Sequence, residues 1–437
     1  MKMTDLIEKK KRGEELSKEE IDFFVKGYVA ETVPDYQASA LLMAIWFNGM
    51  TDRETFDLTM AMKYSGEVLD LSVFGETIDK HSTGGIGDKL SLIVMPLWLS
   101  GGLTIAKMSG RGLGFTGGTV DKLESVPGYD ASLDKAAFFE CVKKNGVAVT
   151  GQSASLVPAD KKLYALRDVT GTVDSLPLIA ASIMSKKLAT AASNIVLDVK
   201  YGEGTFMKTR EDARKLAEVM VHLGESDGRN MAALLSPMDR PLGYAVGNAL
   251  EVKEAYEFLC GNVEGALGEN ALALAGVGFV IGGKAEHLEE GIALCRDLIK
   301  QGSAKAALFR WLKGQGATFD EDDFLSAIAY PAKEYPVLAK TDGVICDINA
   351  LAIGTAGMEM GAGRKKLGDT IDPAAGVLLK KTVGDTVVKG DVLAVLYGKE
   401  RSEIAEDLVS SGIKLGDVAP HPEEIEVYMN QRWEILK

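Results

Sequence analysis

Two glycine-rich loops carry the first residues whose types and spacing could do chemistry. One reads DKHSTGGIGDKLS over residues 79–91, and the other reads MSGRGLGFTGGTVDKLE over residues 108–124. Glycines let backbone amides approach an anion closely, hydroxyl side chains add donors, and Lys80 adds a positive charge. An apolar run over 90–99 predicts a helix whose amino end favours an anion. Together the loops indicate a phosphate site.

The second loop also matches a dinucleotide-binding fingerprint. Residues 112–117 have the GxGxxG spacing, and an acid follows at Asp134. That fingerprint normally occupies the first strand-to-helix turn of its domain, whereas this one follows an earlier anion loop. It is also crowded by the hydroxyls of Ser109, Thr116 and Thr119. Phosphate as a substrate therefore fits the loops better than a nicotinamide cofactor in a dehydrogenase.

The elements before these loops are expected to be helices. Ser17–Glu20 and Thr51–Glu54 have the spacing of capping boxes, and Asp35 is expected to cap a helix over 36–47. The 36–47 segment is apolar nearly all round, which predicts packing on several sides, including a subunit interface.

From about residue 76 the pattern changes to short apolar strands, glycine turns and helices. This alternation predicts a mostly parallel α/β sheet. We expect helices at 158–169, with Pro158 in the first turn, and at 174–190, capped by Asp174, and further helices from 242 to about 314. The expected strands are 103–108, 147–150, 194–199 and 231–235.

The remaining sequence predicts a linker and a separate β-rich module. The linker covers 319–335, which is charged, and Pro331 and Pro336 lie in it and directly after it. Residues 383–396, VGDTVVKGDVLAVL, resemble the turn-and-strand pattern of biotinyl and lipoyl carrier domains. Because no lysine in a hairpin-tip carrier motif accompanies them, a structural module is favoured over a covalent carrier.

Length and composition limit the classes of function. At 437 residues the chain exceeds the size of one hydrophobic core, so two or three domains are expected. No stretch approaches the roughly 20 apolar residues that span a bilayer, and the first residues do not resemble a signal peptide, which predicts a cytoplasmic protein. A net charge of −14 would repel nucleic acid and anionic membranes, so neither is expected as a partner. A bound anion must be held locally.

Taken in order, these motifs resemble the signature of the thymidine and pyrimidine-nucleoside phosphorylases. The resemblance spans nearly the whole chain. It includes KHSTGG at 80–85, SGRGLG at 109–114, TGGTVDKLE at 116–124, PADKKLYALRDVT at 158–170, SIMSKK at 182–187 and GYAVGNALEV at 243–252.

The resemblance implies the residues of the site. It assigns catalytic roles to His81, Arg167 and Lys186. Ser182 and Lys186 are four apart and share one face of the predicted helix, which agrees independently with a joint role. The implied pyrimidine contacts are His81, Tyr164, Arg167, Ser182 and Lys186, and the implied phosphate contacts are Lys80, Ser82, Ser91, Ser109 and Thr119.

The resemblance also implies a fold and a reaction. The fold has an all-α domain (1–70 plus 158–190) facing an α/β domain (71–157 plus 191–330) across a cleft, followed by a C-terminal module (335–437). The chain is expected to form a homodimer through the α domain. The reaction is the reversible phosphorolysis of uridine, thymidine and deoxyuridine to free base and α-(deoxy)ribose 1-phosphate, with no organic cofactor. Residues 106–108, AKM, resemble the branch of broad specificity more than the thymidine-specific one.

One departure concerns a metal ion. Bacterial members of the family have a potassium site of backbone oxygens and a glutamate, which corresponds here to Gly87, Leu242, Ala245 and Glu254. Lys89 stands where a threonine is often found, and its ammonium group is expected to reach the cation position. A potassium requirement is therefore doubtful.

Three alternatives remain open. A thymidine-specific phosphorylase would differ only in whether its site accepts the additional hydroxyl group of the sugar. This small difference cannot be judged from the sequence. An anthranilate-type phosphoribosyltransferase would share the fold and the anion loops, but the pattern of Arg167, Ser182 and Lys186 argues against it. A non-catalytic nucleoside-binding protein would not need the residues of both halves of a reaction site.

Overall fold

The computed structural model describes residues 1–112, 114–115, 117–151, 155–328, 330, 332–366, 368–416, 425–429 and 432–436. The chain divides into two compact units. The first, called here the helical unit, comprises Met1–Asp79, Gln152–Ile195 and Arg214–Met231. The second, the α/β unit, comprises Lys80–Gly151, Val196–Ala213 and Ala232–Lys437.

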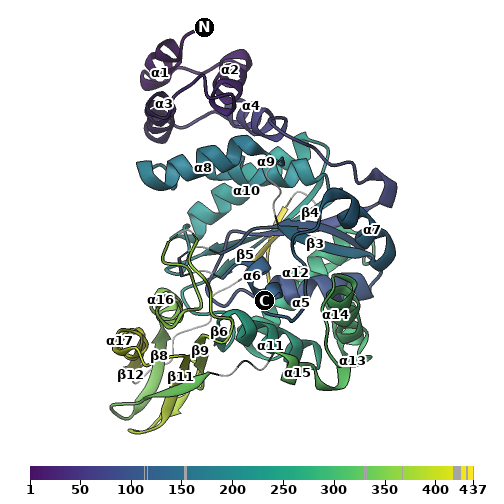
Figure 1. Cartoon of the computed structure of the whole chain (residues 1–437), viewed down its shortest axis with the longest axis vertical. Coiled ribbons are helices and arrows are strands. Elements are labelled where there is room, and N and C mark those ends of the chain that lie inside the picture. Colours follow the sequence, from purple (N-terminus) through teal and green to yellow (C-terminus); the bar gives the residue numbers. More distant parts are fainter. Residues whose placement is uncertain are drawn as a thin grey trace. The chain divides into compact units, whose positions relative to one another are not determined.

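Local capping explains where the first helices of the helical unit begin. Both predicted capping boxes are confirmed: Glu20 N donates to Ser17 Oγ (3.3 Å) while Ser17 N donates to Glu20 (2.7 Å), and Thr51 and Glu54 repeat the arrangement. Pro158 occupies the first turn of its helix, as expected. The elements are α1 (Met3–Lys11), α2 (Lys18–Val29), α3 (Asp35–Asn48), α4 (Asp52–Lys63), the 3-10 turn η1 (Ser72–Phe74), α8 (Pro158–Thr170) and α9 (Leu176–Thr190); Figure 1 labels the helices.

Two predicted caps are wrong. The residue before α3 is Pro34, and Asp35 instead accepts a hydrogen bond from the Tyr28 hydroxyl at 3.0 Å. The residue before α9 is Ser175, and Asp174 accepts from the Trp46 indole at 2.7 Å. In both cases an aromatic donor from a neighbouring helix takes the carboxylate that the helix amides would otherwise bind.

A seven-stranded mixed sheet has the order β14-β13-β5-β4-β1-β2-β3. The α/β class is confirmed, and the four predicted strands are present with ends shifted by one or two residues. β2 and β3 are parallel, whereas β13 is antiparallel to β5 and β14. Sequence analysis missed β1, because TIDKHS lacks an apolar run. The strands are β1 (Thr77–Ser82), β2 (Thr104–Ser109), β3 (Val147–Gly151), β4 (Asn194–Tyr201), β5 (Asn230–Pro237), β13 (Ile425–Met429) and β14 (Arg432–Leu436).

Most of the remaining helices lie between the strands of this sheet in the order of the chain. The most apolar is α5, in which every residue from Leu90 to Leu99 is buried, so it forms part of the core of the α/β unit. α5 packs against α12 and α14. The helices are α5 (Leu90–Ser100), α6 (Thr119–Glu124), α7 (Lys135–Asn145), α10 (Arg210–Ser226), α11 (Asn248–Leu259), α12 (Gly265–Ile281), α13 (Leu288–Lys300), α14 (Ser303–Gly314), the 3-10 turn η2 (Glu321–Asp323) and α15 (Phe324–Ala327).

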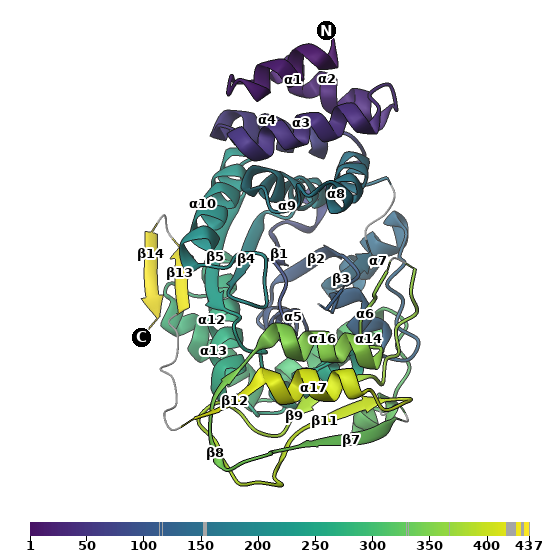
Figure 2. The ribbon, with the colours of Figure 1, turned by 90° about the vertical axis from the view of Figure 1, so that its left-hand side faces the viewer.

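The C-terminal part contributes two small sheets and two helices. α16 and α17 lie side by side (Figure 2). The expected linker over 319–335 contains η2 and α15, and its end already belongs to β7. β13 pairs with β5, and β14 pairs with β13, so both strands belong to the large sheet and not to the small sheets. The elements are β6 (Ala245–Val246), β7 (Lys333–Leu338), β8 (Gly343–Ile348), α16 (Ala350–Met360), β9 (Gly376–Leu379), β10 (Thr386–Val387), β11 (Val392–Gly398), α17 (Glu403–Gly412) and β12 (Ile413–Gly416).

Within the part of the chain that the structure describes, no helix combines the length and the apolar character that a bilayer span requires.

We predict that Glu54→Ala lowers the free energy of unfolding by about 3 kcal/mol, because it leaves the buried Lys10 ammonium without its partner. The Glu54 carboxylate also accepts from the Leu16 and Thr51 amides at 2.8 and 2.9 Å. Glu20→Ala is the matched control, since Glu20 closes the other capping box with partial exposure and should cost about 1 kcal/mol. Equal losses in thermal or denaturant unfolding would contradict this account.

Candidate active site

The first glycine loop begins at the carboxyl end of β1. Thr77 of β1 exchanges hydrogen bonds with Ser193, just before β4, and Thr83 N donates to the Asp198 carbonyl at 3.0 Å. β1 and β4 therefore run in the same direction and end together. Ligands of α/β sheets bind outside such carboxyl ends. The sequence-predicted residues Lys80, His81 and Ser82 all belong to the end of β1.

A buried charge network holds this loop. Lys80 Nζ lies 2.8 Å from Asp198 and 3.7 Å from Asp88, and Lys200 Nζ lies 2.7 Å from the other oxygen of Asp198. The side chains of Lys80, Asp198 and Lys200 are at most 1% exposed. Lys200 also donates to Ser236 at 2.7 Å. These contacts fix the β1, β4 and β5 ends relative to one another.

Asp88 connects the network to the helix that follows. It accepts from the Ser82 hydroxyl at 2.6 Å and from the Leu90 amide, at the start of α5, at 3.1 Å. Burial disfavours its charge, but Lys80, Lys200 and Lys122 outweigh burial and hold the pKa of Asp88 well below its ordinary value. Burial likewise opposes the charge of Lys80, and the two carboxylates nevertheless raise its pKa. The loop is therefore charged and ordered at neutral pH.

The remaining phosphate candidates lie at element ends of the same unit. Ser91 is in the first turn of α5 and is buried, Ser109 is the last residue of β2, and Thr119 is the first residue of α6. Lys107 of β2 donates to the Lys80 carbonyl, which joins the two loops. Thr116, whose hydroxyl was assigned to the second loop, lies outside the described residues, as do Gln152 and Ser153.

The structure brings Ser182 and Lys186 together on α9 of the helical unit. Lys186 Nζ donates to Ser182 Oγ at 3.0 Å and to Asp160 of α8. The Lys186 side chain is 18% exposed, so the ammonium is oriented but still accessible. Asp160 is buried, and its other oxygen has no hydrogen-bond partner among the described residues. Sequence analysis quoted Asp160 only as part of a motif and did not identify it as a site residue.

Arg167, on α8, bridges the turn into α9. Its guanidinium donates to the carbonyls of Thr172 (3.1 Å), Val173 (2.5 Å) and Leu178 (3.0 Å). Burial lowers its pKa, while Asp160 acts in the opposite direction. A guanidinium has five N–H groups, so this clamp leaves donors for a second partner. Arg167 thus holds the turn between α8 and α9, and its side chain is buried.

Tyr164 lies one turn before Arg167 on α8. Its ring is 5.9 Å from the guanidinium carbon, and the side chain is 38% exposed. Burial, with a smaller contribution from Asp168, raises the pKa of its hydroxyl, so it remains a neutral donor. Four of the five candidates for the base therefore belong to two consecutive helices of one unit, and the fifth, His81, belongs to β1.

Three of the four residues assigned to potassium accept hydrogen bonds from Lys89. Its ammonium donates to Leu242 O (2.5 Å), Ala245 O (3.0 Å) and Glu254 Oε2 (2.7 Å), and the lysine is completely buried. A Cβ on Gly87, whose φ is +70°, would lie 3.3 Å from this nitrogen and 2.9 Å from Leu242 O. A potassium ion bound to these oxygens would lie in contact with the Lys89 ammonium, and the two positive charges would repel each other. The residues present do not fit a potassium ion.

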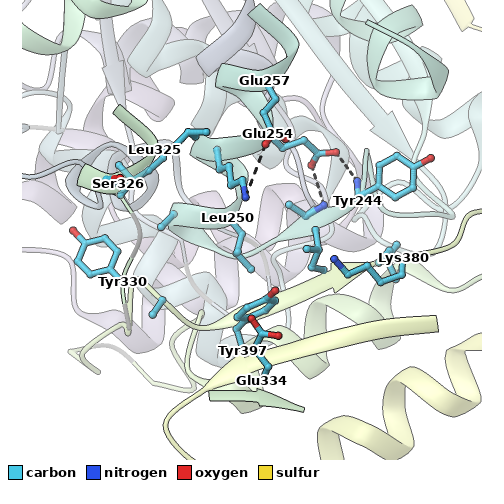
Figure 3. A pocket seen from close by; sticks show the side chains of 17 residues that line it. Tyr244, Leu250, Glu254, Glu257, Leu325, Ser326, Tyr330, Glu334, Lys380 and Tyr397 are labelled. Carbon is cyan, nitrogen blue, oxygen red and sulfur yellow. Dashed lines mark hydrogen bonds and ion pairs between the residues drawn. The ribbon is translucent and has the colours of Figure 1, made fainter. Parts of the chain in front are cut away.

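Two backbone amides hold Glu254 in addition to Lys89. Its two carboxylate oxygens accept from the Tyr244 and Ala245 amides at 2.7 and 2.9 Å, as Figure 3 shows, and the same figure places Glu254 in the wall of a pocket. The loop before α11 is thereby tied to the start of α5 through one buried ion pair.

Sequence analysis did not identify the partners of the candidate cations. Asp88, Asp160 and Asp198 each hold a lysine, but each is one of many acids in the chain. Only the positions of β1 and β4 could have indicated that Asp198 faces Lys80, and β1 was not predicted.

We predict that Asp88→Asn lowers the thermal midpoint of unfolding at pH 7 by removing the charge that pairs with Lys80. Because the folded pKa is depressed, this contribution is present above the unfolded pKa near 4 and is lost as pH falls through the folded value. The difference between wild type and variant should therefore shrink progressively as pH falls below about 4. Asp134→Asn, an exposed helix cap in the same unit, is the control and should change little. A difference independent of pH would contradict the assignment.

Family models match most of the chain. The glycosyl transferase family helical bundle domain matches residues 4–66, the glycosyl transferase family a/b domain matches 75–305, and the pyrimidine nucleoside phosphorylase C-terminal domain matches 344–416. The fold alone is also similar to that of anthranilate phosphoribosyltransferase from Thermus thermophilus, with a TM-score of 0.58 and 21% identity over 71% of this chain and 99% of that one.

Curated relatives decide between those two activities. The pyrimidine-nucleoside phosphorylase of Bacillus subtilis is 51% identical over 92% of this chain and 93% of its own length. The enzyme of the same name from Geobacillus stearothermophilus is also 51% identical, and that of Staphylococcus aureus is 48% identical over 97% of this chain and 98% of its own. The chain is therefore a glycosyltransferase that belongs to the pyrimidine-nucleoside phosphorylase family.

Proposed function

We propose that this chain catalyses the reversible phosphorolysis of uridine, thymidine and deoxyuridine, giving free base and α-(deoxy)ribose 1-phosphate. The phosphate contacts are assigned to residues of the α/β unit, and the base contacts are assigned to four residues of the helical unit and to His81 of β1. The similarity to phosphorylases at about 50% identity supports the reaction class. No organic cofactor takes part in the proposed reaction.

Phosphate is assigned to Lys80, Ser82, Ser91, Ser109 and Thr119. Two features of the structure support this assignment. The hydroxyl candidates lie at the ends of β1 and β2 and at the starts of α5 and α6, where helix amides and hydroxyls are available to an anion. Lys80 and Lys200 place two buried cations in this region, where Asp88 and Asp198 hold them in fixed positions. The bound anion would be the nucleophile, and an oxygen of phosphate would attack the anomeric carbon with inversion.

The base must leave with the electron pair of the glycosidic bond. Arg167 and Lys186 would stabilise the negative charge that grows on the ring carbonyls, and Ser182 and Tyr164 would hold the ring edge. The observation that carries this assignment is the Lys186 ammonium, fixed by Ser182 and Asp160 yet accessible. A cation that is already oriented needs no reorganisation as charge develops.

His81 is assigned the role of proton donor to the departing base. It belongs to β1 directly after Lys80, and its side chain is half-buried. An imidazole has an ordinary pKa near neutrality, so it can donate a proton or a hydrogen bond to the ring oxygen nearest the breaking bond. The proton that the departing base takes would then return from solvent to His81.

A homodimer through the helical unit is part of the proposal. α3 exposes Tyr36 (75%), Trp46 (41%) and Phe47 (72%). Large aromatic side chains on one helix are enriched at subunit interfaces and are costly in water. The face of α3 is thus the expected contact between two copies.

The activity is tested with purified protein, uridine or thymidine, and inorganic phosphate. Free base is followed by ultraviolet absorbance, with and without phosphate. Phosphate-dependent release from both nucleosides is expected. Release from thymidine alone would restrict the proposal to a thymidine-specific enzyme, and release from neither would refute it.

We predict that Lys186→Gln lowers kcat about 100-fold, because it removes the charge that meets the departing base. Glutamine still offers a donor to Asp160, so the fold and the phosphate KM should stay near wild type. Lys161→Gln, on the exposed side of α8, is the control and should be fully active. Near-normal turnover of folded Lys186→Gln would remove this residue from the mechanism. Substitution of Arg167 would be a less selective test, because three backbone carbonyls would also lose their hydrogen-bond donor.

The Lys89 ammonium is proposed to replace the potassium ion of related enzymes. We predict a turnover rate that does not change when potassium is exchanged for a bulky organic cation. Lys89→Thr should lose activity at least about tenfold without potassium and recover when potassium is added, because the oxygens of Leu242, Ala245 and Glu254 become available.

The control for that exchange is Lys253→Thr. Lys253 is a half-exposed lysine of α11, whose ammonium lies 3.9 Å from Glu257, and its variant should stay independent of potassium. Strict dependence of the wild-type enzyme on potassium would overturn the replacement.

A further inference from the structure

The C-terminal module reaches the second glycine loop through Arg364. This arginine follows α16 by four residues, and its Nη1 donates to Gly112 O at 2.9 Å and to Asp121 Oδ2 at 3.0 Å. Nη2 donates to the other Asp121 oxygen at 2.7 Å. The Gly114 amide returns a hydrogen bond to the Arg364 carbonyl at 3.0 Å. One residue therefore contacts both the backbone of the loop and the helix after it.

Asp121 is the point where these contacts meet. It lies in α6, is 2% exposed, and accepts from the Gly112 amide at 2.7 Å as well as from Arg364. Arg111 Nη1 approaches it at 3.3 Å but pairs mainly with the exposed Glu124. Removing the cation would leave this buried carboxylate without its best-buried charged partner. Arg364 is the better buried of the two arginines, at 12% exposure against 50%.

Glycines allow the close approach that this arrangement needs. A Cβ on Gly118 would lie 2.1 Å from the Gly112 amide, so the two ends of the loop touch. A Cβ on Gly363 would lie 2.4 Å from the Gly114 carbonyl, and one on Gly354 would lie 2.4 Å from Ile86 of the first loop. α16 and the segment after it are therefore pressed against both glycine loops of the α/β unit.

We propose that Arg364 is a positioning residue for phosphate: the C-terminal module holds the 109–119 loop in its anion-binding shape through the Arg364–Asp121 pair. This inference rests on the proposed phosphate site and assigns the module a role in it. Arg364 acts through Asp121 and Gly112, and Ser109 and Thr119 at the two ends of the loop are the groups that it aligns.

Steady-state kinetics of the full-length enzyme test the proposal. Arg364→Ala should raise the KM for phosphate at least about tenfold, since a charge-assisted bidentate contact is lost, while the KM for nucleoside changes less than about twofold. Arg364→Lys keeps the charge without the planar fork, so it should raise the phosphate KM by an intermediate amount. Should Arg364→Ala fail to fold, the lysine variant alone decides.

Arg401→Ala is the matched control. Arg401 makes a two-oxygen contact with Glu406 of α17 in the same module, is 66% exposed, and does not belong to the loop. Its loss should leave both KM values unchanged. An unchanged phosphate KM in folded Arg364→Ala, or equal increases in both KM values, would overturn the positioning role.

Hydrogen exchange provides a readout that does not depend on turnover. In Arg364→Ala the peptide covering 109–122 should exchange faster, and the α5 peptide covering 90–100 should exchange as in wild type. Exchange of the 109–122 peptide at the wild-type rate would contradict the proposal even if the enzyme were inactive. Wild-type enzyme that releases base without phosphate would instead refute the proposed function and leave this loop contact intact.

Discussion

The buried pairing of Lys80 and Lys200 with Asp198 is the interaction on which the rest of the α/β unit depends. Three charged side chains that are almost completely buried must satisfy one another, because an unpaired charge there would cost several kcal/mol. The pairing fixes the ends of β1, β4 and β5 in one arrangement. Asp88 extends it to the first turn of α5, so the glycine loop is held at both ends. An acidic protein thereby maintains a local region suited to an anion.

The same principle, a cation held by fixed oxygens, recurs at three other places. Lys89 joins the start of α5 to the loop before α11, Lys186 joins α9 to α8, and Arg364 joins the C-terminal module to α6. In each case the cation connects segments far apart in the sequence. Ordering a loop in advance lowers the entropy that a ligand must otherwise offset on binding. The fold is therefore sensitive to substitution of these residues, since removing one partner of a buried ion pair leaves the other charge uncompensated.

Local signals in the sequence predicted much of the fold. The capping boxes at Ser17 and Thr51 and the apolar strands were identified because each depends on neighbours in sequence. β1 was missed because its polar residues serve the site, and Asp35 and Asp174 were misassigned because distant aromatic donors bind them. The return of β13 and β14 to the large sheet depends on contacts with β5, about 190 residues earlier, that no local pattern encodes.

The candidate site was predictable where it follows a motif and not where it depends on pairing. Lys89 was expected near the cation position from its place in the loop, whereas the roles of Asp160, Asp198 and Arg364 require the three-dimensional structure. Calorimetric titration of inorganic phosphate into the wild-type protein and a Ser109→Ala/Thr119→Val variant tests the central claim most directly. The account predicts one phosphate per wild-type chain and a large loss of affinity in the variant; undetectable binding to wild type, or equal affinity in both proteins, would contradict it.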